Sequence, residues 1–256
     1  MQIKVKCPAK INLDLKVFPV NSDGFHPIKS IMQTINLFDY LTISISEGSG
    51  IFLTGNSIEI PYDEKNICYK AAKLFLQTIK KEHKVEIYIE KNIPVCAGLA
   101  GGSTDAAGVL FGLNKLFNEP LNEEELHKLA SQLGSDLNFC LEGGRILCEG
   151  RGEILTPQDF VEFPITLVKP KNLQISAKEA YQAFDNLKEK SNLPNDLEFA
   201  LLDKYKELQF LHSKGLQMSG SGPTYFIKKE KLDFNLDESF QIIENLKVIN
   251  IGVEQL

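Results

Sequence analysis

A glycine-rich segment combines the residue types that bind phosphate. Residues 94–108 read PVCAGLAGGSTDAAG, in which three glycines precede Ser103 and Thr104. A strand-like segment over 84–90 comes first and a helix-compatible run of small residues follows. That order gathers backbone N–H groups and the positive end of a helix dipole around an anion, and glycine lets the backbone come close to it. The segment predicts a nucleotide or phosphate-ester site, and an ordinary flexible turn is the weaker alternative.

The phosphate loop matches none of the common nucleotide-binding patterns. No GxxxxGK[ST] sequence is present, and the loop is not a dinucleotide-type GxGxxG. The HRD and DFG signatures of protein kinases are also missing. The anion site is therefore predicted from its context, not from one of these motifs.

Two charged residues could act on a phosphoryl group. Lys10 lies on the polar face of a strand otherwise built for burial, and could direct a point charge at a phosphate, although a surface lysine is the simpler alternative. Asp136 follows Gly134 and Ser135 at the start of a short predicted helix, where a carboxylate stays ionised. It could accept the proton of a substrate hydroxyl, and its plain alternative is a helix cap.

Two further segments carry weaker signals. The stretch MSGSGP over 218–223 alternates glycine and serine, and is either a second anion-facing loop or a turn that enters a strand. In DGFH over 23–26, Phe25 and His26 could stack on and hydrogen-bond a planar base. An ordinary turn with a half-buried aromatic ring is the alternative.

Composition narrows the function classes. The chain has 256 residues, 43% of them hydrophobic, and a net charge of −6, which disfavours broad attraction to nucleic acid. No apolar run is long enough to span a membrane, and the N-terminus lacks the apolar core of a secretion signal. We therefore expect a cytoplasmic protein with no nucleic-acid or membrane partner and no obligate protein partner.

Cysteine and histidine usage gives no sign of a metal site. The five cysteines contain no CxxC pair, and the four histidines are far apart in the sequence. Buried reduced thiols are the simpler interpretation, and the ligands of any metal ion stay unknown.

The elements alternate between strand and helix patterns. Strands are predicted over 3–17 with a bend at Pro8, and over 41–46, 51–54, 84–90 and 165–170. Helices are predicted over 66–80, 103–117, 122–133 and 237–246, and a further one after a capping box of Ser176 and Glu179. In the helix over 103–117, Ser103 is the expected cap and Asp105 lies in the first turn. A strand is expected at the C-terminus. The mixture predicts an α+β fold with two lobes, an N-terminal lobe over 1–155 that holds the phosphate loop and a C-terminal α/β lobe over 156–256.

These segments together resemble the GHMP small-molecule kinases. CPAKINLDL (7–15), DGFHPI (23–28), PVCAGLAGGSTDAAG, GSDLNF (134–139) and MSGSGPTYF (218–226) occur in the family's order, so the resemblance covers most of the chain. It implies a two-lobed fold with the active site in the cleft, ATP and Mg²⁺ as cofactors, and a small-molecule substrate. The implied reaction moves the ATP γ-phosphoryl group to the tertiary 2-hydroxyl of a cytidine diphosphate-linked methylerythritol, in the non-mevalonate isoprenoid route.

The resemblance also implies roles for individual residues. Lys10 and Asp136 match the catalytic lysine and aspartate. Asn12, Phe25, His26 and, more weakly, Tyr181 match the substrate pocket. The ATP site would comprise Asn66, Lys91, Pro94, Val95, Cys96, Ala97, Gly98, Leu99, Ala100, Gly101, Gly102, Ser103 and Thr104.

The chain departs from the family pattern inside the phosphate loop. Cys96 and Ala100 stand where glycine is usual, Thr104 where serine is usual, and Phe25 where tyrosine is common. Other GHMP kinases, acting on mevalonate, phosphomevalonate or homoserine, are the nearest alternatives. An inactive nucleotide-binding regulator and a plain α+β binding module are more distant ones, and Lys10 with Asp136 argues against the regulator.

Overall fold

A long antiparallel strand pair forms the centre of the first sheet in the computed structural model, which describes residues 1–22, 24–189 and 191–256. β1 (Gln2–Asn12) pairs with β3 (Ile28–Ser46) along its whole length, and the register shifts between Pro8 and Ala9. The bend expected at Pro8 is thus a bulge within one strand, since proline cannot donate a ladder hydrogen bond.

The first sheet is completed on both sides of this pair. Its main order is β12-β1-β3-β5-β4; β2 and β6 also pair with β3, and β7 pairs with β6. The added strands are β2 (Lys16–Val17), β4 (Ile51–Gly55), β5 (Lys84–Glu90), β6 (Arg145–Gly150), β7 (Ile154–Pro157) and β12 (Glu254–Gln255).

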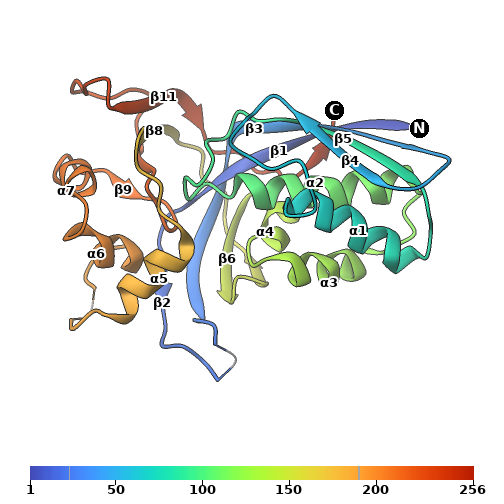
Figure 1. Ribbon diagram of the computed structural model, residues 1–256. Coiled ribbons are helices and arrows are strands. Elements are labelled where there is room, and N and C mark those ends of the chain that lie inside the picture. Colours follow the sequence, from blue (N-terminus) through green and yellow to red (C-terminus); the bar gives the residue numbers. More distant parts are fainter. Residues whose placement is uncertain (23, 190) are drawn as a thin grey trace.

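Four helices cover one face of the first sheet (Figure 1). They are α1 (Ile67–Ile79), α2 (Gly101–Leu116), α3 (Glu123–Leu133) and α4 (Leu137–Glu142). Gly108 and Gly112 let α2 lie close to β1, because a Cβ atom at either position would come within 2.4 or 2.6 Å of side-chain atoms of the sheet. The core between sheet and helices is built from fully buried side chains such as Phe75, Ile87 and Leu110.

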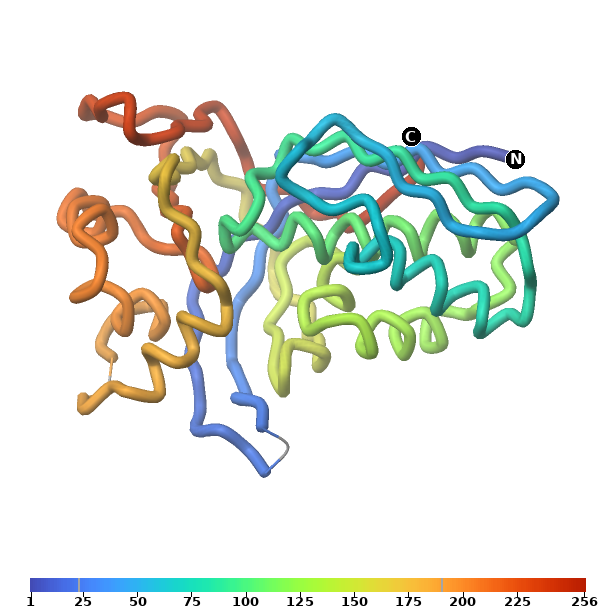
Figure 2. The backbone as a smooth tube through the Cα atoms, viewed as in Figure 1, coloured from blue at the N-terminus to red at the C-terminus, as the bar shows by residue number. Residues whose placement is uncertain are grey.

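A smaller sheet with three helices makes the second part of the molecule (Figures 1 and 2). Its order is β11-β8-β10-β9, and all of its pairs are antiparallel. The elements are β8 (Pro164–Pro170), α5 (Ala177–Asp185), α6 (Asp196–Leu202), α7 (Lys206–Ser213), β9 (Gln217–Met218), β10 (Tyr225–Ile227) and β11 (Phe240–Lys247). The chain then returns to the first sheet, where β12 pairs with β1.

Most sequence-predicted elements are present, and three details differ. The segment 237–246 is not a helix but contains β11, because its backbone pairs with β8 and that tertiary contact outweighs helical spacing. α2 begins at Gly101 rather than Ser103, so Ala100 is the N-cap and Asp105 lies beyond the first turn. Ser176 caps α5 by accepting from the Glu179 N–H, but the Glu179 carboxylate binds Lys204 and Tyr205, so the capping box is half formed.

The predicted α+β fold with two lobes is confirmed. The division expected near residue 155 falls inside β7 of the first sheet, shortly before β8 begins the second sheet, and it stays a prediction. Within the described ranges, no helix is long and apolar enough to cross a membrane.

Candidate active site

A cavity of about 940 Å³ brings together segments that are far apart in the sequence. This volume lies within the range of about 300–1,000 Å³ usual for ligand sites. Its lining includes most sequence-predicted site residues: Lys10, Asn12, Phe25, His26, Asn66, Lys91, Pro94, Val95, Cys96, Ala97, Gly98, Ala100, Gly101, Gly102, Ser103, Asp136 and Tyr181. Leu99 and Thr104 do not line it, since both are fully buried behind the loop.

The phosphate loop places the start of α2 at this cavity. Cys96, Gly98 and Ala100 have φ angles of 50°, 72° and 58°, in the left-handed region that favours glycine. The first helical hydrogen bond runs from the Thr104 N–H to the Ala100 carbonyl. The N–H groups of the three preceding residues are therefore free of helical partners, as an anion-binding helix start requires. The two positions where the family's glycine is replaced thus keep a glycine-like backbone.

Gly98 is required where the loop meets the second glycine-serine segment. A Cβ atom on Gly98 would lie 2.2 Å from the Ser219 carbonyl oxygen, which no side chain tolerates. The Ser219 hydroxyl donates to the Gly98 carbonyl at 3.0 Å and accepts from the Asn12 N–H at 3.2 Å. The segment 218–223 therefore braces the phosphate loop, and its Gly220 and Ser221 also line the cavity.

Lys10 and Asp136 lie within reach of each other at the cavity. The Lys10 ammonium is 3.4 Å from Asp136 Oδ2 and donates to Asn12 Oδ1 at 2.6 Å. The Lys10 side chain is 5% exposed and that of Asp136 26% exposed, so the lysine is held inside while the carboxylate stays accessible. Asp136 is the N-cap of α4, but its side chain makes no capping hydrogen bond. Asp136 thus holds the N-cap position without a capping bond from its side chain, and Lys10 is not a surface lysine.

A short hydrogen-bonded chain holds Asn12 in place. Its amide nitrogen donates to the Ser30 hydroxyl at 2.8 Å, and that hydroxyl donates to the Asp14 carbonyl at 2.6 Å. The Asp14 carboxylate accepts from the Ile31 N–H at 2.6 Å. Sequence reasoning missed Ser30, which lies in no chemistry-bearing pattern. Ser219 belongs to the segment 218–223 that the sequence singled out, but its bonds to Gly98 and Asn12 were not expected.

Aromatic side chains also line the cavity. His26 and Tyr181 stack with their ring centroids 5.3 Å apart, and Phe184 meets His26 edge-on. Phe25 is half exposed and carries the Arg151 guanidinium 3.8 Å above its ring. Burial, assisted by the charge of Asp136, raises the pKa of Tyr181 to about 12, so its hydroxyl stays protonated at neutral pH. Asp23, the first residue of the DGFH motif, lies outside the described residues.

Lys91 belongs to a buried charge cluster at the base of the phosphate loop. Its ammonium donates to Asp105 at 2.7 Å and also to Asp39, and all three side chains are buried. Burial would lower the pKa of Lys91, but attraction to Asp105 and Asp39 outweighs it and raises the pKa. Burial is also the main reason why the pKa of Asp105 is well above its usual value. Sequence reasoning placed Asp105 at a helix start and missed Asp39.

Asn66 has a structural duty in addition to its place at the cavity. Its side-chain oxygen caps α1 by accepting from the Cys68 N–H at 2.9 Å, and its amide donates to the Pro61 carbonyl at 2.6 Å. These bonds fix the loop before α1 where it lines the cavity.

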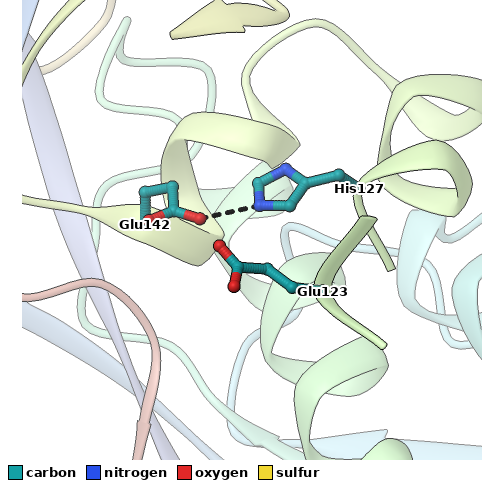
Figure 3. A group of neighbouring side chains, drawn as sticks. All are labelled: Glu123, His127 and Glu142. Atoms are coloured by element: carbon teal, nitrogen blue, oxygen red, sulfur yellow. Dashed lines mark hydrogen bonds and ion pairs between the residues drawn. The ribbon is translucent and has the colours of Figure 1, made fainter. Parts of the chain in front are cut away.

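A separate group of side chains joins α3 to the end of α4. Glu123, His127 and Glu142 point toward one another, and His127 Nε2 is 2.7 Å from Glu142 Oε1 (Figure 3). The hydrogen bond to Glu142 raises the pKa of His127 against the effect of burial, and the same bond lowers the pKa of Glu142. The group does not line the cavity, and we interpret it as an ion pair between helices. All five cysteines are free and four are buried, in line with reduced thiols.

The comparisons with known proteins agree with this geometry. The GHMP kinases N terminal domain family matches residues 66–144, which include α1, β5, the phosphate loop and the helices α2 to α4. A solved homoserine kinase from Cytophaga hutchinsonii has a TM-score of 0.72 at 17% identity and covers the whole chain and 97% of its own, which shows the fold. Fold and site together define a GHMP-type small-molecule kinase.

Closer relatives narrow the class further. A 4-diphosphocytidyl-2-C-methyl-D-erythritol kinase from Syntrophomonas wolfei is 40% identical over 93% of this chain and 94% of its own length. A crystal structure of 4-(cytidine 5'-diphospho)-2C-methyl-D-erythritol kinase has a TM-score of 0.74 at 30% identity, over 88% of this chain and 89% of that one. The chain belongs to the 4-diphosphocytidyl-2-C-methyl-D-erythritol kinase family, and it is an ATP-dependent kinase of small molecules.

Proposed function

We propose that this protein transfers the γ-phosphoryl group of ATP to the tertiary 2-hydroxyl of 4-diphosphocytidyl-2-C-methyl-D-erythritol, in the non-mevalonate route to isoprenoid precursors. The observation that carries the proposal is one cavity lined by the phosphate loop, the Lys10–Asp136 pair and the aromatic side chains of Phe25, His26 and Tyr181. Each of these groups supplies what one part of the reaction needs. A cytoplasmic location is part of the same proposal.

The phosphate loop fits the phosphates of ATP. The free N–H groups of Gly101, Gly102 and Ser103 begin α2 at the cavity, and the close approach of Gly98 to Ser219 keeps the loop narrow. Mg²⁺, when bound, would neutralise charge on the β- and γ-phosphoryl oxygens. The Ser103 hydroxyl, which lines the cavity, is a candidate ligand from this chain. Asn66 and Lys91 would flank the adenosine.

Asp136 would accept the proton of the substrate hydroxyl, and Lys10 would offset negative charge on the phosphoryl group. The accessible Asp136 carboxylate accepts the proton of the attacking hydroxyl, and the buried Lys10 ammonium orients that carboxylate and offsets charge on the transferring group. Phosphoryl transfer through a loose transition state asks mainly for such positioning. Asn12 holds the ammonium in place through its 2.6 Å hydrogen bond.

The cytosine would lie among the aromatic side chains. His26 and Tyr181 already stack on each other at 5.3 Å, and a base inserted between two rings needs about 7 Å. The base is therefore expected to stack on Phe25 and on the outer face of the His26–Tyr181 pair, not between those two rings. Binding would displace the Arg151 guanidinium from the face of Phe25.

A substrate panel tests the proposal directly. Purified protein with ATP and Mg²⁺ is offered 4-diphosphocytidyl-2-C-methyl-D-erythritol, mevalonate, phosphomevalonate and homoserine in parallel, and ADP release is measured. Turnover with the cytidyl substrate alone is expected. Turnover with another acceptor would assign the protein to another activity of the GHMP kinases. ATP binding without turnover would favour an inactive nucleotide-binding regulator.

A further inference from the structure

A second cavity, of about 240 Å³, lies beside the phosphate loop. One wall comes from the first sheet and its loops, with Ser57 and Asn92, and the other from the end of β8, with Lys169 and Lys171. Lys91, Pro94 and Val95 line both this cavity and the larger one. The second cavity therefore lies between the two lobes, next to the ATP site. Neither Lys10 nor Asp136 lines it, and no proposed step uses it.

Lys169 is a buried cation with no counter-charge among the residues that the structure describes. The residue is 9% exposed, and its ammonium makes one long hydrogen bond, 3.5 Å to the Pro170 carbonyl. It forms no ion pair with any residue of the ranges 1–22, 24–189 and 191–256. Buried lysines are normally paired because the charge loses its hydration. Lys91 shows the usual solution, since its equally buried ammonium binds the two carboxylates of Asp39 and Asp105.

The other groups around Lys169 suit an anion. Lys171 brings a second, exposed ammonium from the same end of β8, and Ser57 and Gln241 offer neutral donors. Glu59 is the one carboxylate among the lining residues, and it is exposed. Lys91 lines the cavity too, but Asp39 and Asp105 already neutralise its charge. Lysine ammonium groups bind phosphate as point charges. The volume holds a phosphate group with some of its water but not a second nucleotide.

From these observations we infer that the cavity is a phosphate-binding site that bridges the two lobes, with Lys169 as its principal charge partner. The anion supplies the counter-charge that the protein lacks there, and it contacts loops of the first lobe and β8 of the second at once. None of the residues whose free N–H groups begin α2 lines this cavity, so the phosphate and the phosphates of ATP are expected to bind at different places.

The test separates this site from the phosphate loop. The full chain is first saturated with Mg²⁺ and a non-hydrolysable ATP analogue, and inorganic phosphate is then titrated by calorimetry. One phosphate per chain is expected, without release of the analogue. Lys169→Met should weaken phosphate binding at least about tenfold, Lys171→Met less, and Lys73→Met, which alters an exposed lysine on α1, not at all.

Thermal unfolding gives an independent readout of the same variants. Because Lys169→Met removes an unpaired buried charge, the variant should melt at a higher temperature than the parent in phosphate-free buffer. Added phosphate should then raise the melting temperature of the parent but not of the variant. The proposal fails if phosphate does not bind, if it displaces the analogue, or if Lys169→Met and the parent bind it equally. Lys169→Gln serves in the same assays should the methionine variant not fold.

Discussion

Lys10 illustrates how single residues are placed for chemistry in this protein. Its ammonium is almost completely buried, donates a hydrogen bond to Asn12 and forms an ion pair with Asp136. Burial strengthens the attraction between the two charges and excludes competing water. Asp136 keeps its accessible side toward the cavity, where a hydroxyl substrate would approach.

Replacing Asp136 tests its role as proton acceptor. Asp136→Asn keeps the shape of the side chain but cannot accept the hydroxyl proton, so kcat should fall by about 10²–10⁴-fold. The melting temperature should stay close to that of the parent, because the side chain makes no capping bond. Steady-state ADP release together with thermal unfolding checks both statements. A variant with near-normal kcat would remove Asp136 from the role of base.

Ala100 tests the strain stored in the phosphate loop. Its φ of 58° costs about 1–2 kcal/mol for a residue with a Cβ atom, whereas glycine in the unfolded chain costs about 0.5–1 kcal/mol in entropy. Ala100→Gly should therefore leave the free energy of unfolding within about 1 kcal/mol of the parent, or raise it slightly. Ala100→Val should lower it by more than about 1 kcal/mol, as urea unfolding would show. Equal stability of the valine variant and the parent would contradict the strained backbone.

At the scale of elements, helix starts and strand ends supply the site. α2 presents its first N–H groups to the cavity, α4 presents Asp136, and β1 presents Lys10. The helix α4 has only about one and a half turns, so few of its own contacts fix its position. The hydrogen bond between Glu142 and His127 on α3 helps to fix it. This contact depends on pH.

The His127–Glu142 pair predicts a pH window of stability. Because the pKa of His127 is raised above its usual 6.5, its contribution is complete below that pH and is lost as pH rises through the folded-state pKa. Because the pKa of Glu142 is lowered from its usual 4.5, its contribution is complete above that pH and is lost as pH falls. The pair should therefore stabilise α3 against α4 most between pH 4.5 and pH 6.5.

A double-mutant cycle measures this pair. His127→Ala, Glu142→Gln and the double variant are unfolded in urea at about pH 5.5 and about pH 8.5. The coupling free energy between the two positions should be clear at the lower pH and smaller at the higher one. Because both side chains are partly exposed, the value should stay modest. Equal coupling at both pH values would show that the charge on His127 plays no part.

At the scale of the whole molecule, the two lobes are joined by close backbone contacts and by the path of the chain. Gly98 lies against Ser219, Leu15 bridges to Asn195, and β12 returns from the second lobe to pair with β1. The phosphate loop of the first lobe is thus held in place by Ser219 of the second lobe. A change at this contact should affect ATP binding more than any other step.

Gly98→Ala tests the contact between the lobes. The new Cβ atom would lie 2.2 Å from the Ser219 carbonyl at a backbone with a φ of 72°, so the segment 218–223 must move. The KM for ATP should rise several-fold and the melting temperature should fall. Gly102→Ala is the matched control for stability, since its Cβ would meet nothing closer than 3.8 Å and helical positions accept alanine well. If both variants melted alike, the support from Ser219 would be unimportant.

The sequence by itself determined the local chemistry of this protein. The phosphate loop, Lys10, Asp136 and the capped helices could be predicted because each depends on residues close together along the chain. The five ordered segments also predicted the family, which the relatives confirm.

Only the tertiary structure decided which distant groups meet. It turned 237–246 into a strand by pairing it with β8, and it buried Lys91 between Asp39 and Asp105. It also placed the Lys10 ammonium 3.4 Å from Asp136, and it left Lys169 with no counter-charge in the described part of the chain. None of this could be predicted from local pattern, because pairing partners and burial depend on residues far apart in the sequence and outweigh local propensity.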